Sequence, residues 1–169
     1  MFTGNCLSQE DGMKRVLFDF DTSGNIREYV FQFYDEETDL WSDDVKWIFT
    51  YNSEGEVLEK TEQFRDFDNN IWVNHQRYLS VYDGNGFLKE YYRQTWIPGT
   101  ETWQNAWRDI YVYDSHGNNT IYTEQDWDAA DHKWLNYFRN IYFYDSQGNL
   151  TEVVPRVWDP LEKSWFQKE

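Results

Sequence analysis

The apolar and polar positions of this chain follow a pattern that repeats every 31 residues. Within one period, residues 106–113 (AWRDIYVY) and 120–127 (TIYTEQDW) are rich in aromatic and β-branched side chains, which suit the half-buried surface of a β-strand. The short polar segment 114–118 separates them, and the polar segment 128–133 leads into the next period. A fixed period of this size is typical of repeat architectures, in which one supersecondary unit recurs.

Five glycines mark the period, and other residue types recur at fixed distances from them. A Trp follows each glycine by 17 residues, a Gln follows the first four by eight, and a second Trp follows the last three by ten. A basic residue recurs with the same period. The members are Gly24, Gly55, Gly86, Gly117 and Gly148; Trp41, Trp72, Trp103, Trp134 and Trp165; Gln32, Gln63, Gln94 and Gln125; Trp96, Trp127 and Trp158; and Arg15, Lys46, Arg77, Arg108 and Arg139.

Each glycine closes a turn that begins with Asp or Asn, as at 114–117. The first side chain can bond the backbone of the turn, and the glycine supplies the positive φ that a type I turn plus bulge needs. Each period is therefore predicted to be a β-hairpin, with connections too short for crossover helices. The sequence predicts an all-β fold: an elongated, twisted antiparallel meander of about ten or eleven strands, from near Met13 to near Trp165.

One β-repeat domain is predicted over residues 13–169, after a segment 1–12 that lacks the repeat signature. The acidic stretch 9–12 (QEDG) is expected to discourage strand addition at the N-terminal edge. With 169 residues the chain is long enough to bury a core. The pattern is compatible with an open meander and with one that closes into a barrel.

Composition narrows the classes of partner. The net charge of −16 repels phosphate backbones and anionic membranes, and no apolar run approaches membrane-spanning length, so we expect neither nucleic-acid binding nor membrane insertion. The aromatic content of 21% contradicts disorder. No signal-peptide pattern follows Met1, so the leader of an exported form would have been removed or would lie outside this sequence. Cys6 is a lone cysteine, which excludes an intrachain disulfide; Asn5 before it disfavours lipid attachment, and other modification of Cys6 stays open.

Recurrent polar residues predict a structural ladder along the sheet. The glutamates hold one phase of the second strand of each hairpin, with Ile121 as the exception, and the glutamines lie four residues further on the same face. Pairs of opposite charge on neighbouring strands stabilise a sheet by roughly 0.2–1 kcal/mol each. Catalysis would need one special constellation, whereas this one is copied, so we expect no catalytic residue. The ladder comprises Glu28, Glu59, Glu90, Glu152, Gln32, Gln63, Gln94, Gln125, Arg77, Arg108 and Arg139, with Lys46 in the phase of the arginines.

The two Trp series are expected at one end of the sheet, opposite the glycine turns. They can pack on each other, which contributes roughly 0.5–1.5 kcal/mol per pair beyond burial. They can also form a row of platforms on which sugar rings stack. The candidate ligand-binding residues are Trp72, Trp96, Trp103, Trp127, Trp134 and Trp158.

Other chemistries are not indicated. The turn at 83–86 (DGNG) lacks the further oxygen ligands and the distal Glu of a calcium loop. His75, His116 and His132 fall at three unrelated phases of the repeat, so no metal site is expected. The sequence contains no phosphate-binding loop and no nucleophile motif, and no cofactor is expected.

Residues 111–118 (YVYDSHGN) and 142–151 (YFYDSQGNLT) resemble the YD (RHS) repeat, whose core is Tyr-x-Tyr-Asp-x-x-Gly followed by an apolar residue and a Thr. Segments 125–128 (QDWD) and 134–139 (WLNYFR) are similar instead to the Trp-rich tandem repeats of uncharacterised exported Bacteroidetes proteins. The resemblance covers residues 15–167. It implies an exported or surface β-repeat protein without established enzymatic activity. Because the period is longer than the YD unit, the closed toxin-encapsulating shell of that family is not expected.

Two functions fit these observations. The first is a non-catalytic, extracellular or cell-surface module that binds a glycan or a protein through aromatic side chains. The second is a structural stalk or assembly element, in which the aromatics serve packing alone. Several Trp rings exposed in line would favour binding. An enzyme would need a pocket that breaks the repeat symmetry and holds perturbed carboxylates. Self-association, a partner chain or a larger assembly could cover a face of the sheet.

Overall fold

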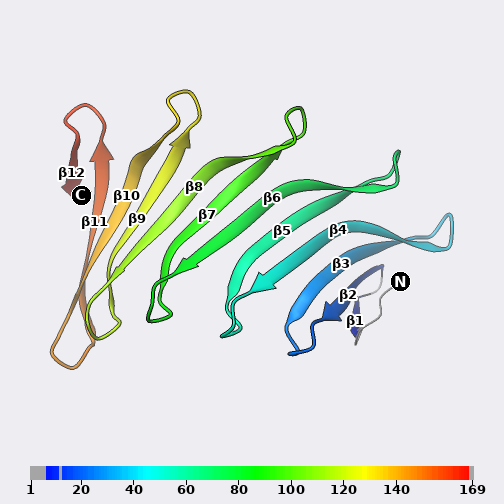
Figure 1. Ribbon diagram of the computed structural model, residues 1–169, viewed down its shortest axis with the longest axis horizontal. Helices are drawn as coiled ribbons and strands as arrows, with labels where there is room; N and C mark the ends of the chain where they lie inside the picture. Colours follow the sequence, from blue (N-terminus) through cyan, green and yellow to red (C-terminus); the bar gives the residue numbers. More distant parts are fainter. Residues whose placement is uncertain (1–6, 12, 168–169) are drawn as a thin grey trace. The chain divides into compact units, whose positions relative to one another are not determined.

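The computed structural model describes residues 7–11 and 13–167. These residues form antiparallel β-strands joined by hairpin connections, which confirms the predicted all-β meander (Figure 1). Among them is no helix that is long and apolar enough to cross a membrane. The chain divides into two compact units, Met1–Tyr78 and Leu79–Glu169, called the first and the second unit below. Within each unit the strand order follows the sequence.

The boundary between the units falls within β6 (Ile71–Tyr82). Before it lie β1 (Leu7–Asp11), β2 (Lys14–Phe20), β3 (Ile26–Asp35), β4 (Leu40–Tyr51) and β5 (Val57–Asp66). After it lie β7 (Leu88–Ile97), β8 (Thr102–Tyr113), β9 (Asn119–Asp128), β10 (Lys133–Tyr144), β11 (Leu150–Asp159) and β12 (Ser164–Gln167).

The glycine turns have the predicted chemistry. The Asp21 carboxylate accepts backbone hydrogen bonds from Ser23 at 2.8 Å and Asn25 at 2.9 Å, and Gly24 has a φ of 89°. The side chain thus holds the turn closed while the glycine occupies the left-handed region. The same arrangement recurs at the turns that begin with Asn52, Asp83, Asp114 and Asp145.

The connections at the other end also share one conformation, which the sequence did not reveal. In each connection, the residue directly before the next strand is not glycine and has a φ between 50° and 58°. Four of these connections begin with an aspartate whose carboxylate accepts a backbone N–H two residues on. The left-handed residues are Asp39, Asn70, Glu101, His132 and Lys163, again 31 residues apart.

The N-terminal edge differs from expectation, because residues 7–11 form β1 against β2. The acidic stretch at 9–12 therefore does not prevent strand addition by the chain itself. The register places Glu10 opposite Arg15 and Asp11 opposite Lys14. Because β1 precedes Met13, the predicted ten or eleven strands correspond to the series from β2 onward. Cys6 lies outside the described residues.

Few apolar side chains are buried in the part of the chain that the structure describes, contrary to the expectation from chain length. Among these residues, Val30 and Val154 are buried, at 3% and 9% exposure. The reason is that the described strands of each unit form one sheet, with no second layer from the same unit to cover it. Aromatic and long polar side chains instead half-bury one another on the sheet faces.

Candidate ligand-binding site

Each unit has one sheet face that carries the recurrent Trp residues, called its Trp face below. In the second unit the register places Trp96 opposite Trp103 and Trp127 opposite Trp134, so the two Trp series meet on one face. The ring centroids of these pairs lie 5.1 Å and 4.9 Å apart, at 65° in both. Trp158 and Trp165 repeat this geometry at 5.1 Å. Five of the six predicted ligand-binding residues therefore belong to edge-to-face Trp pairs.

The first unit keeps the pairing with different residues. Trp41 pairs with Tyr34, with ring centroids 5.3 Å apart. Trp72, the sixth predicted residue, instead has the guanidinium of Arg65 at 5.3 Å from its ring centroid. The position that is Trp in the later repeats is therefore Tyr or Arg in the first unit, and each of these side chains lies against the cross-strand indole.

The recurrent basic residues cover the Trp rings of the following hairpin. Distances from the cationic group to the ring centroid are 4.2 Å for Arg15 and Trp41, 4.6 Å for Lys46 and Trp72, 4.6 Å for Arg108 and Trp134, and 4.4 Å for Arg139 and Trp165. Such contacts contribute roughly 0.5–2 kcal/mol each. They join one hairpin to the next and occupy part of the ring surface that a stacked ligand would need.

Arg108 shows how the polar ladder works. Its Nε donates to Gln125 at 2.7 Å, and its Nη1 lies 3.2 Å from a carboxylate oxygen of Glu90. Gln125 in turn donates to Asn136 at 2.6 Å. The network links β7, β8, β9 and β10, and it holds the guanidinium in place above its Trp.

The ladder varies along the chain. Gln63 donates to Asn74 at 2.8 Å and Gln94 to Asn105 at 2.7 Å. Gln32 accepts from Arg15 at 2.5 Å and donates to Asp43. The partners Asp43, Asn74, Asn105 and Asn136 are missing from the predicted ladder, although their own 31-residue spacing could have revealed them.

The remaining ladder residues form only part of the network described for Arg108, or form other contacts. Arg77 pairs with Glu59 at 3.5 Å. Arg139 lies opposite Arg156, where earlier repeats have Gln, and its Nε donates to Thr123 at 3.0 Å. Burial lowers the pKa of the Lys46 ammonium, and the charge of Glu28 opposes that shift. Glu152 is exposed and lies opposite Phe143 in register.

A groove of about 470 Å³ opens on the Trp face of the second unit, between the Trp96–Trp103 pair and the Trp127–Trp134 pair. Its aromatic walls are Trp103 and Trp127, both predicted to bind ligand. None of the lining residues is Asp, Glu, Lys or Arg, although the protein as a whole is strongly acidic. The lining consists of Gln94, Ile97, Thr100, Thr102, Trp103, Gln104, Asn105, Trp127 and His132.

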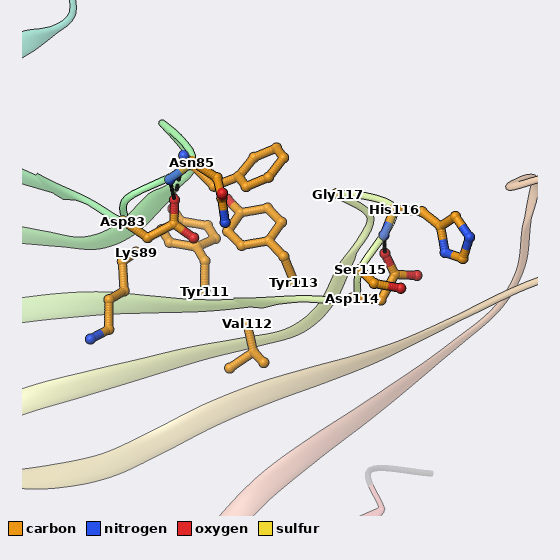
Figure 2. A pocket seen from close by; sticks show the side chains of 11 residues that line it. Asp83, Asn85, Lys89, Tyr111, Val112, Tyr113, Asp114, Ser115, His116 and Gly117 are labelled. Atoms are coloured by element: carbon orange, nitrogen blue, oxygen red, sulfur yellow. Dashed lines mark hydrogen bonds between the residues drawn. The ribbon is translucent and has the colours of Figure 1, made fainter.

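A larger groove, of about 660 Å³, lies at the opposite end of the second unit between successive turns. Figure 2 shows Asp83 on one turn and Asp114 on the next, with Tyr113 between them. Both carboxylates are engaged by backbone N–H groups of their own turns, and the Asn118 side chain holds the pKa of Asp114 below its usual value. A comparable groove of about 540 Å³ lies between the turns of the first unit, so this feature follows from the repeat itself.

Phe87 sets the second-unit turn groove apart. The same phase of the repeat carries Asn25, Glu56, Asn118 and Asn149, which bond the first side chain of their own turns. Phe87 cannot do so, and its ring stacks on Tyr113 at 4.9 Å instead.

A polar cluster on the other face of the second unit holds a perturbed carboxyl. Burial raises the pKa of Asp109, although hydrogen bonds from Tyr122 at 2.8 Å and Tyr111 at 3.5 Å oppose the shift. Burial also raises the pKa of Tyr111 to about 12. Asp109 lines neither groove of the second unit. Within the part of the chain that the structure describes, no three His, Cys, Asp or Glu side chains gather as metal ligands would.

No protein-family model matches the sequence, and no curated protein matches it either. Among solved structures, the chain is similar to a protein of unknown function from Bacteroides fragilis, with a TM-score of 0.59, 9% identity, and coverage of 82% of this chain and 93% of that one. At this identity the likeness shows a shared fold alone.

Two further similarities are weaker. A DUF3836 family protein from Bacteroides vulgatus has a TM-score of 0.45 and 18% identity, over 56% of this chain and 91% of that one. The TcdB2-TccC3-TEV structure has a TM-score of 0.46 and 16% identity, over 95% of this chain and 9% of that one. The structural neighbours thus include Bacteroides proteins, and the resemblance to the YD repeat stays a prediction.

Proposed function

We propose that the protein is a non-catalytic β-repeat module that binds a neutral glycan in the groove between Trp103 and Trp127. The observation that carries this proposal is the chemistry of the lining. In a chain with a net charge of −16, this groove has aromatic walls and no charged carboxylate or cationic side chain. A nucleic acid or an anionic lipid would require Lys or Arg side chains that the lining of the groove does not include.

The lining suits a saccharide in detail. Indole rings offer the C–H faces of a sugar a flat apolar surface. Around them, the lining includes the amide side chain of Asn105 and the hydroxyl of Thr100, which are groups of the kind that form hydrogen bonds with sugar hydroxyls. A protein partner would more often be expected at a wider apolar surface than at this groove.

The second candidate is a structural spacer. It is favoured by the edge-to-face Trp pairs and by the cations above Trp41, Trp72, Trp134 and Trp165, which give the rings packing partners within the protein. For either function we propose a location outside the cell or on its surface, as the resemblance to exported repeat proteins implies.

The test compares alanine substitutions of Trp residues inside and outside the groove, and Trp41 occupies the same repeat position as Trp103. Trp103→Ala and Trp127→Ala should each weaken binding of a neutral polysaccharide, found on a glycan array and measured by calorimetry, by at least about tenfold. Trp41→Ala removes an equivalent indole outside the groove and should leave affinity within about twofold. If no glycan binds, and Trp emission stays protected from iodide with every polysaccharide, the structural spacer is the better description.

A further inference from the structure

The first unit has an exposed apolar cluster on the face away from its Trp row, called the apolar patch below. Each of its side chains is at least 38% exposed. The strand residues alternate with those of the Trp face and therefore point to the other side of the sheet. The patch consists of Phe31, Phe33, Leu40, Phe64, Phe67 and Ile71.

The patch is continuous across the strands. The register aligns Phe31 with Val45 and Val45 with Phe64, so one apolar row crosses β3, β4 and β5. Phe67, in the connection after β5, lies with its ring 6.2 Å from that of Phe33. Exposed apolar surface on this scale commonly marks a contact site.

The repeat does not require apolar residues at these positions. The phase of Phe33 and Phe64 carries Thr95 and Asp126 in the second unit, and the phase of Leu40 and Ile71 carries Thr102 and Lys133. The polar residues occupy the same strand positions there, within β7, β8, β9 and β10. Folding therefore does not explain the patch.

Charge around the patch indicates what covers it. The two connections that flank the patch carry six carboxylates, while the cation Lys14 lies opposite Phe33 in register and the ring of His75 lies 4.4 Å from that of Phe64. The equivalent connections of the second unit, 97–101 (IPGTE) and 128–132 (DAADH), carry fewer. A second copy would bring the same carboxylates face to face, which disfavours self-association through this surface. The six are Asp35, Glu36, Glu37, Asp39, Asp66 and Asp68.

We infer that the apolar patch docks a protein segment in which large apolar side chains alternate with lysine or arginine. The apolar side chains of the partner cover the phenylalanines, and its cations meet the carboxylates of the two connections. The site lies in the first unit and does not depend on the proposed glycan groove.

The probe is a synthetic peptide in which lysine alternates with phenylalanine and leucine, titrated against the full chain by fluorescence anisotropy. Two matched peptides separate the contributions: one replaces lysine by glutamate, and the other replaces the apolar residues by serine. The first peptide should bind at least about tenfold more tightly than either of the others. If the lysine–serine peptide binds as tightly as the first peptide, binding reflects only the general attraction of cations to an acidic protein. That result would overturn the inference.

The matched variant gives the patch the residues of the second unit. Phe33→Thr, Leu40→Thr and Ile71→Thr together keep the charge and the strand propensity, and should weaken peptide binding at least about tenfold. Leu135→Thr removes an exposed apolar residue of the second unit and should change binding by less than about twofold. The inference fails if both variants bind alike, or if sedimentation shows self-association that the triple substitution abolishes, since the occupant would then be a second copy.

Discussion

The two units use one repeat and present different surfaces away from their Trp rows. In the first unit, Trp47 lies under the Lys60 ammonium at 3.9 Å. In the second, the same two phases carry Asp109 and Tyr122, which form a hydrogen bond of 2.8 Å. A cation–π contact and a tyrosine–carboxylate bond thus occupy equivalent places on equivalent strands. The backbone of the hairpin accommodates either pair of side chains, so the residues at these two positions can differ between the units without changing the fold.

The Trp face varies far less between the units. Each described Trp of the first series has a cross-strand side chain against it, and in most repeats a cation of the preceding hairpin lies above it. This difference indicates that the Trp face holds hairpins together, while the opposite face distinguishes one unit from the other.

The largest expected effect on stability comes from a comparison of two glycines that have nearly the same φ but different surroundings. Gly24 and Gly117 have φ values of 89° and 87°, so alanine at either is strained by roughly 1–2 kcal/mol. A Cβ at Gly24 meets no atom within 4 Å, whereas one at Gly117 lies 2.7 Å from the Phe87 ring. Gly117→Ala should therefore lower the free energy of unfolding, measured in urea, by about 1–3 kcal/mol more than Gly24→Ala.

Phe87→Asn provides the control for this pair. Asn is the residue that three other repeats carry at that phase, and it removes the ring that alanine would strike. In that background the two alanine substitutions should become equal. A persisting difference would show that Phe87 is not its cause.

An exchange of basic residues tests the ladder with a smaller effect. Arg108 faces Gln125 and Lys46 faces Gln63 in the same register, but Gln63 Oε1 is buried and accepts no hydrogen bond among the described residues. Lys46→Arg should satisfy that oxygen and stabilise the chain by about 0.5–1.5 kcal/mol. The reverse change, Arg108→Lys, should lower the unfolding free energy by about 1–2 kcal/mol. Equal and negligible shifts in the urea midpoint would contradict the role assigned to the ladder.

The smallest effect concerns pH and the site where the units differ most. Because the pKa of Asp109 is raised on folding, the folded state binds more protons than the unfolded one between the two pKa values. The contribution of the Asp109 carboxyl to the free energy of unfolding is fully present below its pKa in the unfolded state. It is lost as the pH rises through its pKa in the folded state. Asp109→Asn keeps an acceptor for Tyr122 and removes the titration.

Urea unfolding at a series of pH values above about 4 should show this difference. The Asn variant should lose less stability than the parent as pH rises, by less than about 1 kcal/mol in total. The turn aspartates act with the opposite sign: hydrogen bonds lower the pKa of Asp145, so its contribution is present above the unfolded pKa and is lost as pH falls. Parallel pH profiles of parent and variant would contradict the assignment to Asp109.

Local chemistry explains which features the sequence could predict. The turn at Asp21 and Gly24 needs a short side chain that accepts hydrogen bonds and a residue that tolerates positive φ. These residue types therefore predict the turn from the sequence. The opposite connections also contain a left-handed residue, and Asp39 and His132 are of types that adopt positive φ more readily than most. Glu101 and Lys163 are not, so residue type alone did not mark the position.

Contacts between hairpins were beyond prediction for a different reason. Arg108 reaches Trp134 only because bulges fix the register of β8, β9 and β10. The groove beside Trp103 and Trp127 similarly depends on the spacing of two adjacent pairs. The pattern could place these residues on one face, but the distances that turn them into partners or into a groove arise from register.

The uniform strand lengths have a consequence for heredity. β4, β6, β8 and β10 each have 12 residues, and β3, β5, β7, β9 and β11 each have 10. Unequal recombination between any two copies in the gene would therefore insert or delete whole hairpins in frame, with every residue kept on the same face of the sheet. Lineages carrying such a gene can change the number of hairpins in a single genetic event. Each new contact between neighbouring hairpins then uses the same Trp, Arg and Gln positions as the existing contacts.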